Sequence, residues 1–254
     1  TPASGSTNAA GGAATPLTVS VNPTGLTAGT YNGNISVTPT TPGTNPVVVN
    51  VTLTVTTPNP PNGLQVSNNA SGLSRGISPG LFITIKGRNM APATGVVFST
   101  VPAPTTLGEV RVLFDNVPAP LIYVGPAGDR NGDQINAVVP YGIGGRASTN
   151  LVVEYKGIAS QSIPLTIRET DPGLYTANQS GSGAASLLNQ DNSANAQNNP
   201  AVAGSIIQIY GTGEGGFSPN PGDGRAVPTT QPFPTLLSGP VQVRINGRVA
   251  QVLY

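Results

Sequence analysis

Three oxygen-bearing side chains stand at alternate positions in one short segment of the chain, residues 129–133. Asp129, Asn131 and Asp133 have the spacing with which a loop wraps oxygen ligands around Ca²⁺. A full EF-hand pattern would place glycine next and a glutamate six residues later, where this chain has Gln134 and Pro140. Asp, Asn and Gly are also the residues that a plain turn favours. The segment therefore predicts a turn, with a calcium loop as the alternative.

The residue types behind most enzyme mechanisms are missing, because the chain has no Cys, His or Trp. Thiol nucleophiles, imidazole bases and the usual ligands of zinc, copper and haem are thereby removed. Ten acidic residues remain, but no spacing singles out the paired carboxylates of a glycosidase. Glu109, Glu154 and Glu169 lie in or beside alternating segments and are most simply solvent-facing. We expect no enzymatic activity and, calcium aside, no cofactor.

The glycine-rich run Gly211–Gly216 has the composition of a phosphate-binding loop. Such a loop also needs a lysine and a following helix, and the sequence offers neither after Gly216. We expect a strand exit there.

The seven tyrosines have two interpretations. They would form a sugar-stacking platform if they gathered on one face, or they cap the cores of separate modules. They are Tyr31, Tyr123, Tyr141, Tyr155, Tyr175, Tyr210 and Tyr254.

Charge is scarce, with 11 basic and 10 acidic residues among 254 and none before Arg75. A net charge of +1 creates no field that would attract nucleic acid or an anionic membrane. No apolar run approaches the length of about 18 residues that a membrane-spanning helix needs. The 33 glycines and 26 prolines would interrupt long helices almost everywhere. Composition therefore predicts an all-β protein, and its low charge favours an exported one.

Alternation of apolar and polar residues predicts strands in the first part of the chain. Residues 1–15 are small and polar and are typical of an arm or linker. Alternation begins at 17–21, continues at 31–37 and is clearest at 47–55. The prolines of segment 57–63 cannot continue a ladder, so we place a domain boundary near residue 60.

An internal repeat organises the rest of the chain. Gly80–Gly87 matches Gly204–Gly211, and Val110–Tyr123 matches Val241–Tyr254 without a gap. Asn246-Gly247 is a strong signal for a two-residue hairpin turn, and Asp115-Asn116 occupies the equivalent place in the first copy.

The repeat divides the chain into residues 1–60, 61–170 and 171–254. The first copy continues beyond Tyr123 through further strand-like segments, whereas the second stops at the equivalent residue, Tyr254. We expect the last module to lack roughly three strands, and both end modules to be incomplete.

Several motifs of residues 62–254 resemble the Solibacter-type uncharacterised C-terminal domain, whose modules are similar to IPT/TIG immunoglobulin-like sandwiches. The motifs are Gly76–Gly80, Asn89–Pro92, Pro118–Tyr123, Gln134–Tyr141, Leu151–Tyr155, Asp171–Tyr175 and Leu187–Asp191. The resemblance implies a place at the end of a large exported bacterial protein and carries no catalytic residues.

The first part, residues 16–31 with the strand at 47–55, resembles the second half of a BACON-type β-sandwich. This resemblance implies further strands before residue 1.

These observations predict an all-β chain of tandem immunoglobulin-like antiparallel sandwiches with incomplete end modules. The function that they favour is a self-associating subunit of an extracellular fibre or bacterial surface layer, with copies of itself as partners. The alternative is an array of adhesion modules that binds carbohydrates or surfaces within a larger secreted protein, with surface glycans as partners. We expect no nucleic-acid partner and no membrane span.

Overall fold

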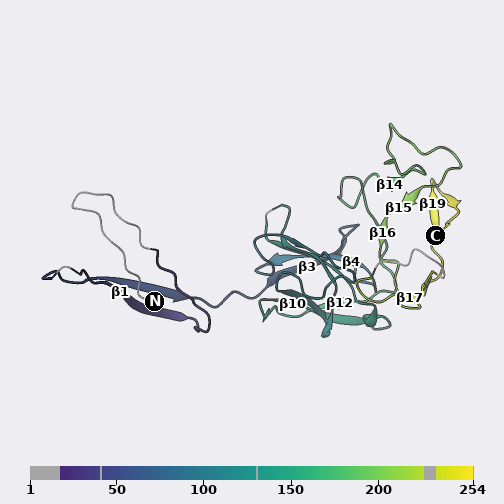
Figure 1. The fold of residues 1–254 in the computed structure, drawn as a ribbon. Helices are drawn as coiled ribbons and strands as arrows, with labels where there is room; N and C mark the ends of the chain where they lie inside the picture. Colours follow the sequence, from purple (N-terminus) through teal and green to yellow (C-terminus); the bar gives the residue numbers. More distant parts are fainter. Residues whose placement is uncertain (1–17, 41, 130, 226–232, 254) are drawn as a thin grey trace. The chain divides into compact units, whose positions relative to one another are not determined.

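The computed structural model describes residues 18–40, 42–129, 131–225 and 233–253. The chain forms two compact units, Thr1–Pro58 and Asn59–Tyr254, which are described separately. The described residues form strands and one short 3-10 helix, η1 (Tyr141–Ile143), and every pair of named strands is antiparallel (Figure 1). The predicted all-β class is confirmed. None of the described helical residues makes a helix long and apolar enough to cross a membrane.

The first unit contains a two-stranded sheet of β1 (Gly29–Val37) and β2 (Val47–Val55). Its register pairs Tyr31 with Leu53 and Ile35 with Val49. Because side chains alternate across a strand, this register gathers the apolar side chains of both strands on one face. The strand expected at residues 17–21 does not form within the described part, Thr18–Val21, which pairs with no other segment there.

The second unit begins with two five-stranded sheets. Their strands run in the orders β3-β4-β9-β8-β5 and β11-β10-β6-β7, and β12 also pairs with β10. The bounds of the first sheet are β3 Asn62–Asn68, β4 Phe82–Arg88, β5 Val96–Val97, β8 Leu121–Pro126 and β9 Asp133–Val138. Those of the second are β6 Val110–Phe114, β7 Val117–Pro118, β10 Ser148–Tyr155, β11 Ile158–Ala159 and β12 Ile163–Thr166.

One apolar core joins the two sheets into a sandwich-like body. Ile83 and Ile85 of β4, Phe114 of β6 and Leu151 of β10 are fully buried in it. Their alternation along each strand explains this arrangement, since residues two apart lie on the same face. Burying each such side chain contributes about 1.5–3 kcal/mol to folding.

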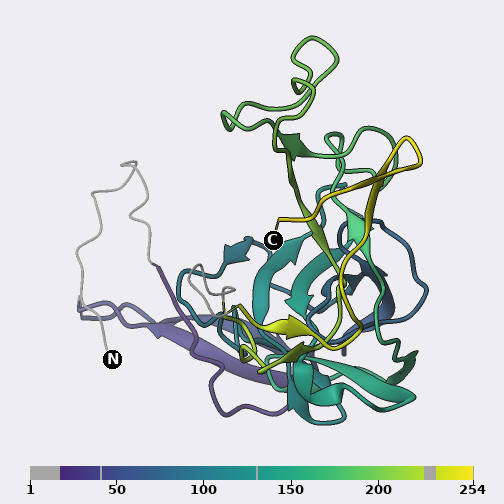
Figure 2. The ribbon, with the colours of Figure 1, turned by 90° about the vertical axis from the view of Figure 1, so that its right-hand side faces the viewer.

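The remainder of the second unit consists of short two-stranded sheets joined by turns (Figure 2). The pairs are β13–β16, β14–β15, β17–β18 and β19–β20. Their bounds are β13 Gly173–Leu174, β14 Leu187–Leu188, β15 Gln208–Ile209, β16 Gly211–Thr212, β17 Phe217–Ser218, β18 Thr235–Leu236, β19 Val243–Ile245 and β20 Arg248–Ala250.

Hydrogen bonds tie this C-terminal part to the sandwich. The buried Asn68 side chain donates to the Asp171 carbonyl at 2.7 Å. The Phe82 amide donates to the Thr212 hydroxyl at 2.9 Å. Both parts lie within the single unit Asn59–Tyr254, and a separation into modules 61–170 and 171–254 stays a prediction.

Candidate functional site

Residues 129–133, for which the sequence predicts a turn with a calcium loop as the alternative, follow strand β8. Asp129 accepts a hydrogen bond from the Asn131 amide at 3.0 Å, which is the local contact that Asx turns make. Its other carboxylate oxygen lies 3.4 Å from the Lys86 ammonium. The hydrogen bond from the Asn131 amide, which has the larger effect, and the Lys86 contact lower the pKa of Asp129 below its ordinary value. This carboxylate is therefore partnered within the protein.

Asp133 at the start of β9 turns toward a different neighbour. Its carboxylate accepts the main-chain N–H of the buried Met90 at 2.8 Å. The part of the chain that the structure describes contains no cluster of three or more acidic, His or Cys residues able to hold a metal, and Arg130 lies outside it. The structure gives Asp129 and Asp133 structural contacts, and calcium binding here stays an untested alternative to the turn.

A pocket of about 460 Å³ lies where the sandwich meets the C-terminal part of the second unit. Pro79, Tyr141 and Ile167 come from the sandwich side, and Phe217 and Leu237 from strands β17 and β18 and the turn that follows. These side chains give the pocket mainly apolar walls. The sequence alone does not reveal this group, because its members are spread over residues 79 to 238 and share no spacing.

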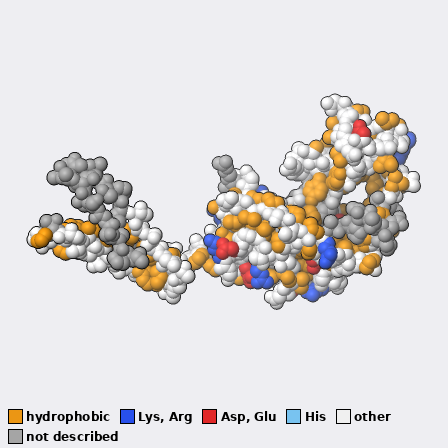
Figure 3. All heavy atoms as spheres, in the orientation of Figure 1, with side chains coloured by type: hydrophobic (Ala, Val, Ile, Leu, Met, Phe, Trp, Pro, Cys, Tyr) orange, Lys and Arg blue, Asp and Glu red, His pale blue; other side chains and the backbone are white. Residues whose placement is uncertain are grey.

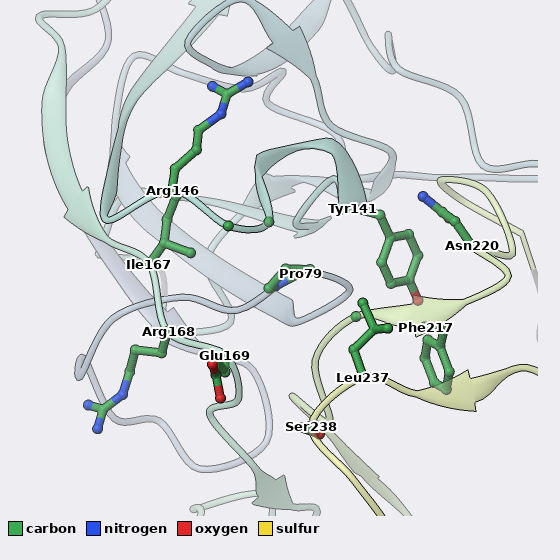
Figure 4. A pocket seen from close by; sticks show the side chains of 13 residues that line it. Pro79, Tyr141, Arg146, Ile167, Arg168, Glu169, Phe217, Asn220, Leu237 and Ser238 are labelled. Carbon is green, nitrogen blue, oxygen red and sulfur yellow. The ribbon is translucent and has the colours of Figure 1, made fainter.

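The two aromatic rings of the pocket contact each other. Tyr141 and Phe217 pack edge to face, with ring centroids 6.1 Å apart and planes at 69° (Figure 4). The Tyr141 amide is fixed by the Asp223 carboxylate at 2.8 Å. This geometry is typical of aromatic packing that also stabilises a fold.

Two arginines at the rim point away from the aromatic pair (Figure 4). Arg146 lies 3.5 Å from the Asp115 carboxylate, and Arg168 donates to the Arg75 carbonyl at 3.2 Å. Glu169 adds a carboxylate to the lining. Apolar walls with a few polar groups suit noncovalent binding of a small, partly apolar molecule.

Glu214, in the glycine-rich run Gly211–Gly216, is a titratable group near this pocket. Burial raises the pKa of Glu214 above its ordinary value, and burial followed by the nearby Glu214 charge raises the pKa of Tyr175. Gly213 and Gly215 have φ of +91° and +96°, and their backbone packs tightly against residues 169–171. The run begins in strand β16 and leaves it after Thr212, as the predicted strand exit requires.

The described tyrosines sit on different elements and have separate partners. Tyr123 donates to the Pro126 carbonyl at 2.8 Å, and Tyr175 donates to the Asn69 side chain at 3.0 Å. Lys156 lies over the ring of Tyr155, 5.3 Å from its centroid. Each of these contacts is explained by packing of its own region. Tyr254 lies outside the described residues.

The most extensive exposed apolar surface of the first unit is the face of the β1–β2 sheet. It carries nine-residue strands in register, with Val37, Val47 and Val49 exposed and Ile35 and Leu53 half-buried. The opposite face carries mainly Thr, Asn and Ser. Figure 3 shows the charged side chains on the second unit, in accord with the position of Arg75 as the first charged residue.

A second exposed apolar surface lies on the β19–β20 hairpin at the periphery of the second unit (Figure 1). Val241 and Ile245 are about half exposed on one face of the hairpin, and Val249 is 65% exposed on the other. The outer edge of β19 pairs with no other strand among the described residues. An unpaired edge beside exposed apolar residues is a template for another strand.

Comparison with protein-family models, curated proteins and solved structures finds no match to this chain. The resemblances to the Solibacter-type domain and to the BACON-type sandwich therefore stay expectations from the sequence.

Proposed function

We propose that this protein is an exported structural protein of a bacterium, a subunit that associates with copies of itself in an extracellular fibre or surface layer. One observation carries the proposal: the β1–β2 sheet presents an apolar face on which Val37, Val47 and Val49 are about half exposed. A two-stranded sheet is marginally stable alone in water. Because these valines are only about half exposed, covering each one would contribute roughly half of the about 1.5–3 kcal/mol that burying a whole side chain contributes.

Composition and resemblance support the same proposal. The first 74 residues carry no charge, so like-charge repulsion does not oppose the approach of two copies through this part. The resemblance to a domain at the ends of exported bacterial proteins is the reason for placing the protein outside the cell.

Neighbouring valines on opposite faces of β2 provide a matched test. Val48 and Val49 are 54% and 50% exposed, so either position accepts aspartate without burying its charge in the monomer. Val49→Asp places a charge on the apolar face and should abolish concentration-dependent association in sedimentation velocity. Val48→Asp places the same charge on the opposite face and should preserve it.

The result that contradicts the proposal is equal behaviour of the two variants, or a native chain that stays monomeric at every concentration. Far-ultraviolet circular dichroism of both variants would verify that the sheet is retained.

The pocket with Tyr141 and Phe217 favours a second candidate function, the binding of a surface glycan. Aromatic side chains and the amide of Asn220 are groups that sugars use, although the two rings already pack together. Binding on a glycan array that Tyr141→Ala removes would support this function. Binding that the variant leaves unchanged would exclude this pocket as its site.

A further inference from the structure

The two copies of the repeat form the same hairpin. Both central turn residues have positive φ in each copy, 46° and 71° at Asp115 and Asn116, and 48° and 78° at Asn246 and Gly247. Phe114 pairs with Val117 in the first copy, and Ile245 pairs with Arg248 at the equivalent positions in the second. The contacts of the first hairpin therefore indicate which contacts the strands of the second hairpin can make.

The two hairpins differ in what covers them. Val110, Val112 and Phe114 are fully buried in the first. Their equivalents are Val241, Val243 and Ile245, of which Val243 is half-buried and Ile245 is 52% exposed. The sequence repeats a core-facing pattern at a place where the described structure supplies no core for it.

Strand β10 provides the missing contact in the first copy. It pairs antiparallel with β6, with Leu151 opposite Phe114 and Val153 opposite Val112. The edge of β19 that corresponds to this junction is unpaired among the described residues. A strand that completes the second hairpin must therefore carry apolar side chains at alternate positions, as β10 does with Leu151, Val153 and Tyr155.

Residues Thr18–Val21 have this pattern, and they pair with no strand among the residues that the structure describes. Val19 and Val21 are 52% and 51% exposed, and the segment belongs to no sheet of the described structure. In the sequence, Leu17-Thr-Val-Ser-Val21 repeats the apolar positions of Leu151-Val-Val-Glu-Tyr155. The segment also carries no charge that pairing would have to desolvate.

We propose that Thr18–Val21 of one copy adds as an antiparallel strand to the free edge of β19 in a second copy. The inference rests on the proposed self-association and names the segments that join. The register follows from the first copy: Val19 lies opposite Val243, as Val153 lies opposite Val112. Main-chain hydrogen bonds supply the attachment, and the alternating valines extend the apolar face of the hairpin.

The absence of native cysteine permits a direct test by disulfide trapping. A chain with Val19→Cys is mixed with a tagged chain carrying Val243→Cys and is oxidised. Opposed residues on neighbouring strands have Cβ atoms about 4.5–5.5 Å apart, close to the range that a disulfide spans. We expect a mixed dimer on a non-reducing gel.

Arg244→Cys in place of Val243→Cys is the matched control. It is one residue away and points to the opposite face, so its yield of mixed dimer should be at least tenfold lower. Adding Ile245→Asp to the Val243→Cys chain should reduce trapping, because the charge lies on the apolar face that the added strand would extend. Val249→Asp, on the other face of the hairpin, should leave trapping unchanged.

Three results would overturn the inference: equal trapping at positions 243 and 244, no trapping at either, or a chain with both Val19→Cys and Val243→Cys that closes the disulfide within itself. If trapping fails while Val49→Asp still abolishes association, strand addition is wrong and the proposed function stands. If the native chain stays monomeric and trapping fails, both are wrong.

Discussion

Asp133 holds a contact that neither composition nor spacing reveals. Its carboxylate accepts the amide of Met90, 43 residues earlier in the chain. Met90 is fully buried, so its main-chain N–H has no access to water and depends on that oxygen. The same residue therefore serves as a structural acceptor where the spacing alone also permitted a metal ligand.

Asp133→Ala should lower the free energy of unfolding by about 1–3 kcal/mol, because it leaves a buried amide without an acceptor. Chemical denaturation measures this change. Asp129→Ala is the control and should have little effect, since its carboxylate and its Lys86 partner are both about half exposed. Neither EDTA nor added calcium should move the melting temperature. A calcium-dependent rise that the double variant Asp129→Ala with Asp133→Ala abolishes would contradict the turn interpretation.

Glu214 is the carboxyl group whose pKa burial raises. A raised pKa in the folded state means that ionisation opposes folding. The stability that protonated Glu214 contributes is present below its ordinary pKa of 4.5 and is lost as the pH rises through the raised value.

Glu214→Gln removes that ionisation. The melting temperature of the variant minus that of the native chain should therefore be larger at pH 7.5 than at pH 4. Scanning calorimetry of both proteins at the two pH values measures this difference. An identical difference at the two pH values would show that burial of this carboxyl does not affect stability.

At the scale of elements, strands β6 and β19 form equivalent hairpins but differ in how much of their apolar side chains is buried. Phe114 of β6 is fully buried, whereas its equivalent Ile245 of β19 is 52% exposed. Phe114→Ala should lower the free energy of unfolding by about 3–5 kcal/mol. Ile245→Ala should change it by no more than about 0.5 kcal/mol in the monomer. Comparable losses measured by denaturation at low protein concentration would mean that β19 is covered in the monomer.

Local pattern was sufficient to predict these elements from the sequence. The alternation at 47–55 became β2, and Asn246-Gly247 became a hairpin turn with positive φ at both residues. Both features depend on neighbouring residues only, so the sequence contains them directly.

Features that depend on distant partners could not be predicted in this way. The segment 17–21 alternates as well as β2 does, yet its described residues form no strand, because a strand also needs an edge to pair with. The pocket walls likewise come from elements far apart in the chain. Pairing and closure are set by tertiary packing, which spacing does not encode.

At the scale of the molecule, the two parts of the second unit should differ in autonomy. Residues 62–170 contain both five-stranded sheets and nearly all of the buried apolar core. Residues 171–254 contain strand pairs of two or three residues. Hydrogen bonds to Asp171 and Thr212 attach this part to the sandwich. An isolated 62–170 fragment should unfold cooperatively on heating, and an isolated 171–254 fragment should show no cooperative transition. A sharp transition in the second fragment would refute the incomplete-module prediction.

Self-association is the central claim, and electron microscopy of the purified chain over a range of concentrations tests it most directly. The open apolar face of β1–β2 and the free edge of β19 predict regular polymers or sheets, which should disappear in Val49→Asp and persist in Val48→Asp. Separate particles of uniform size at every concentration would contradict the claim.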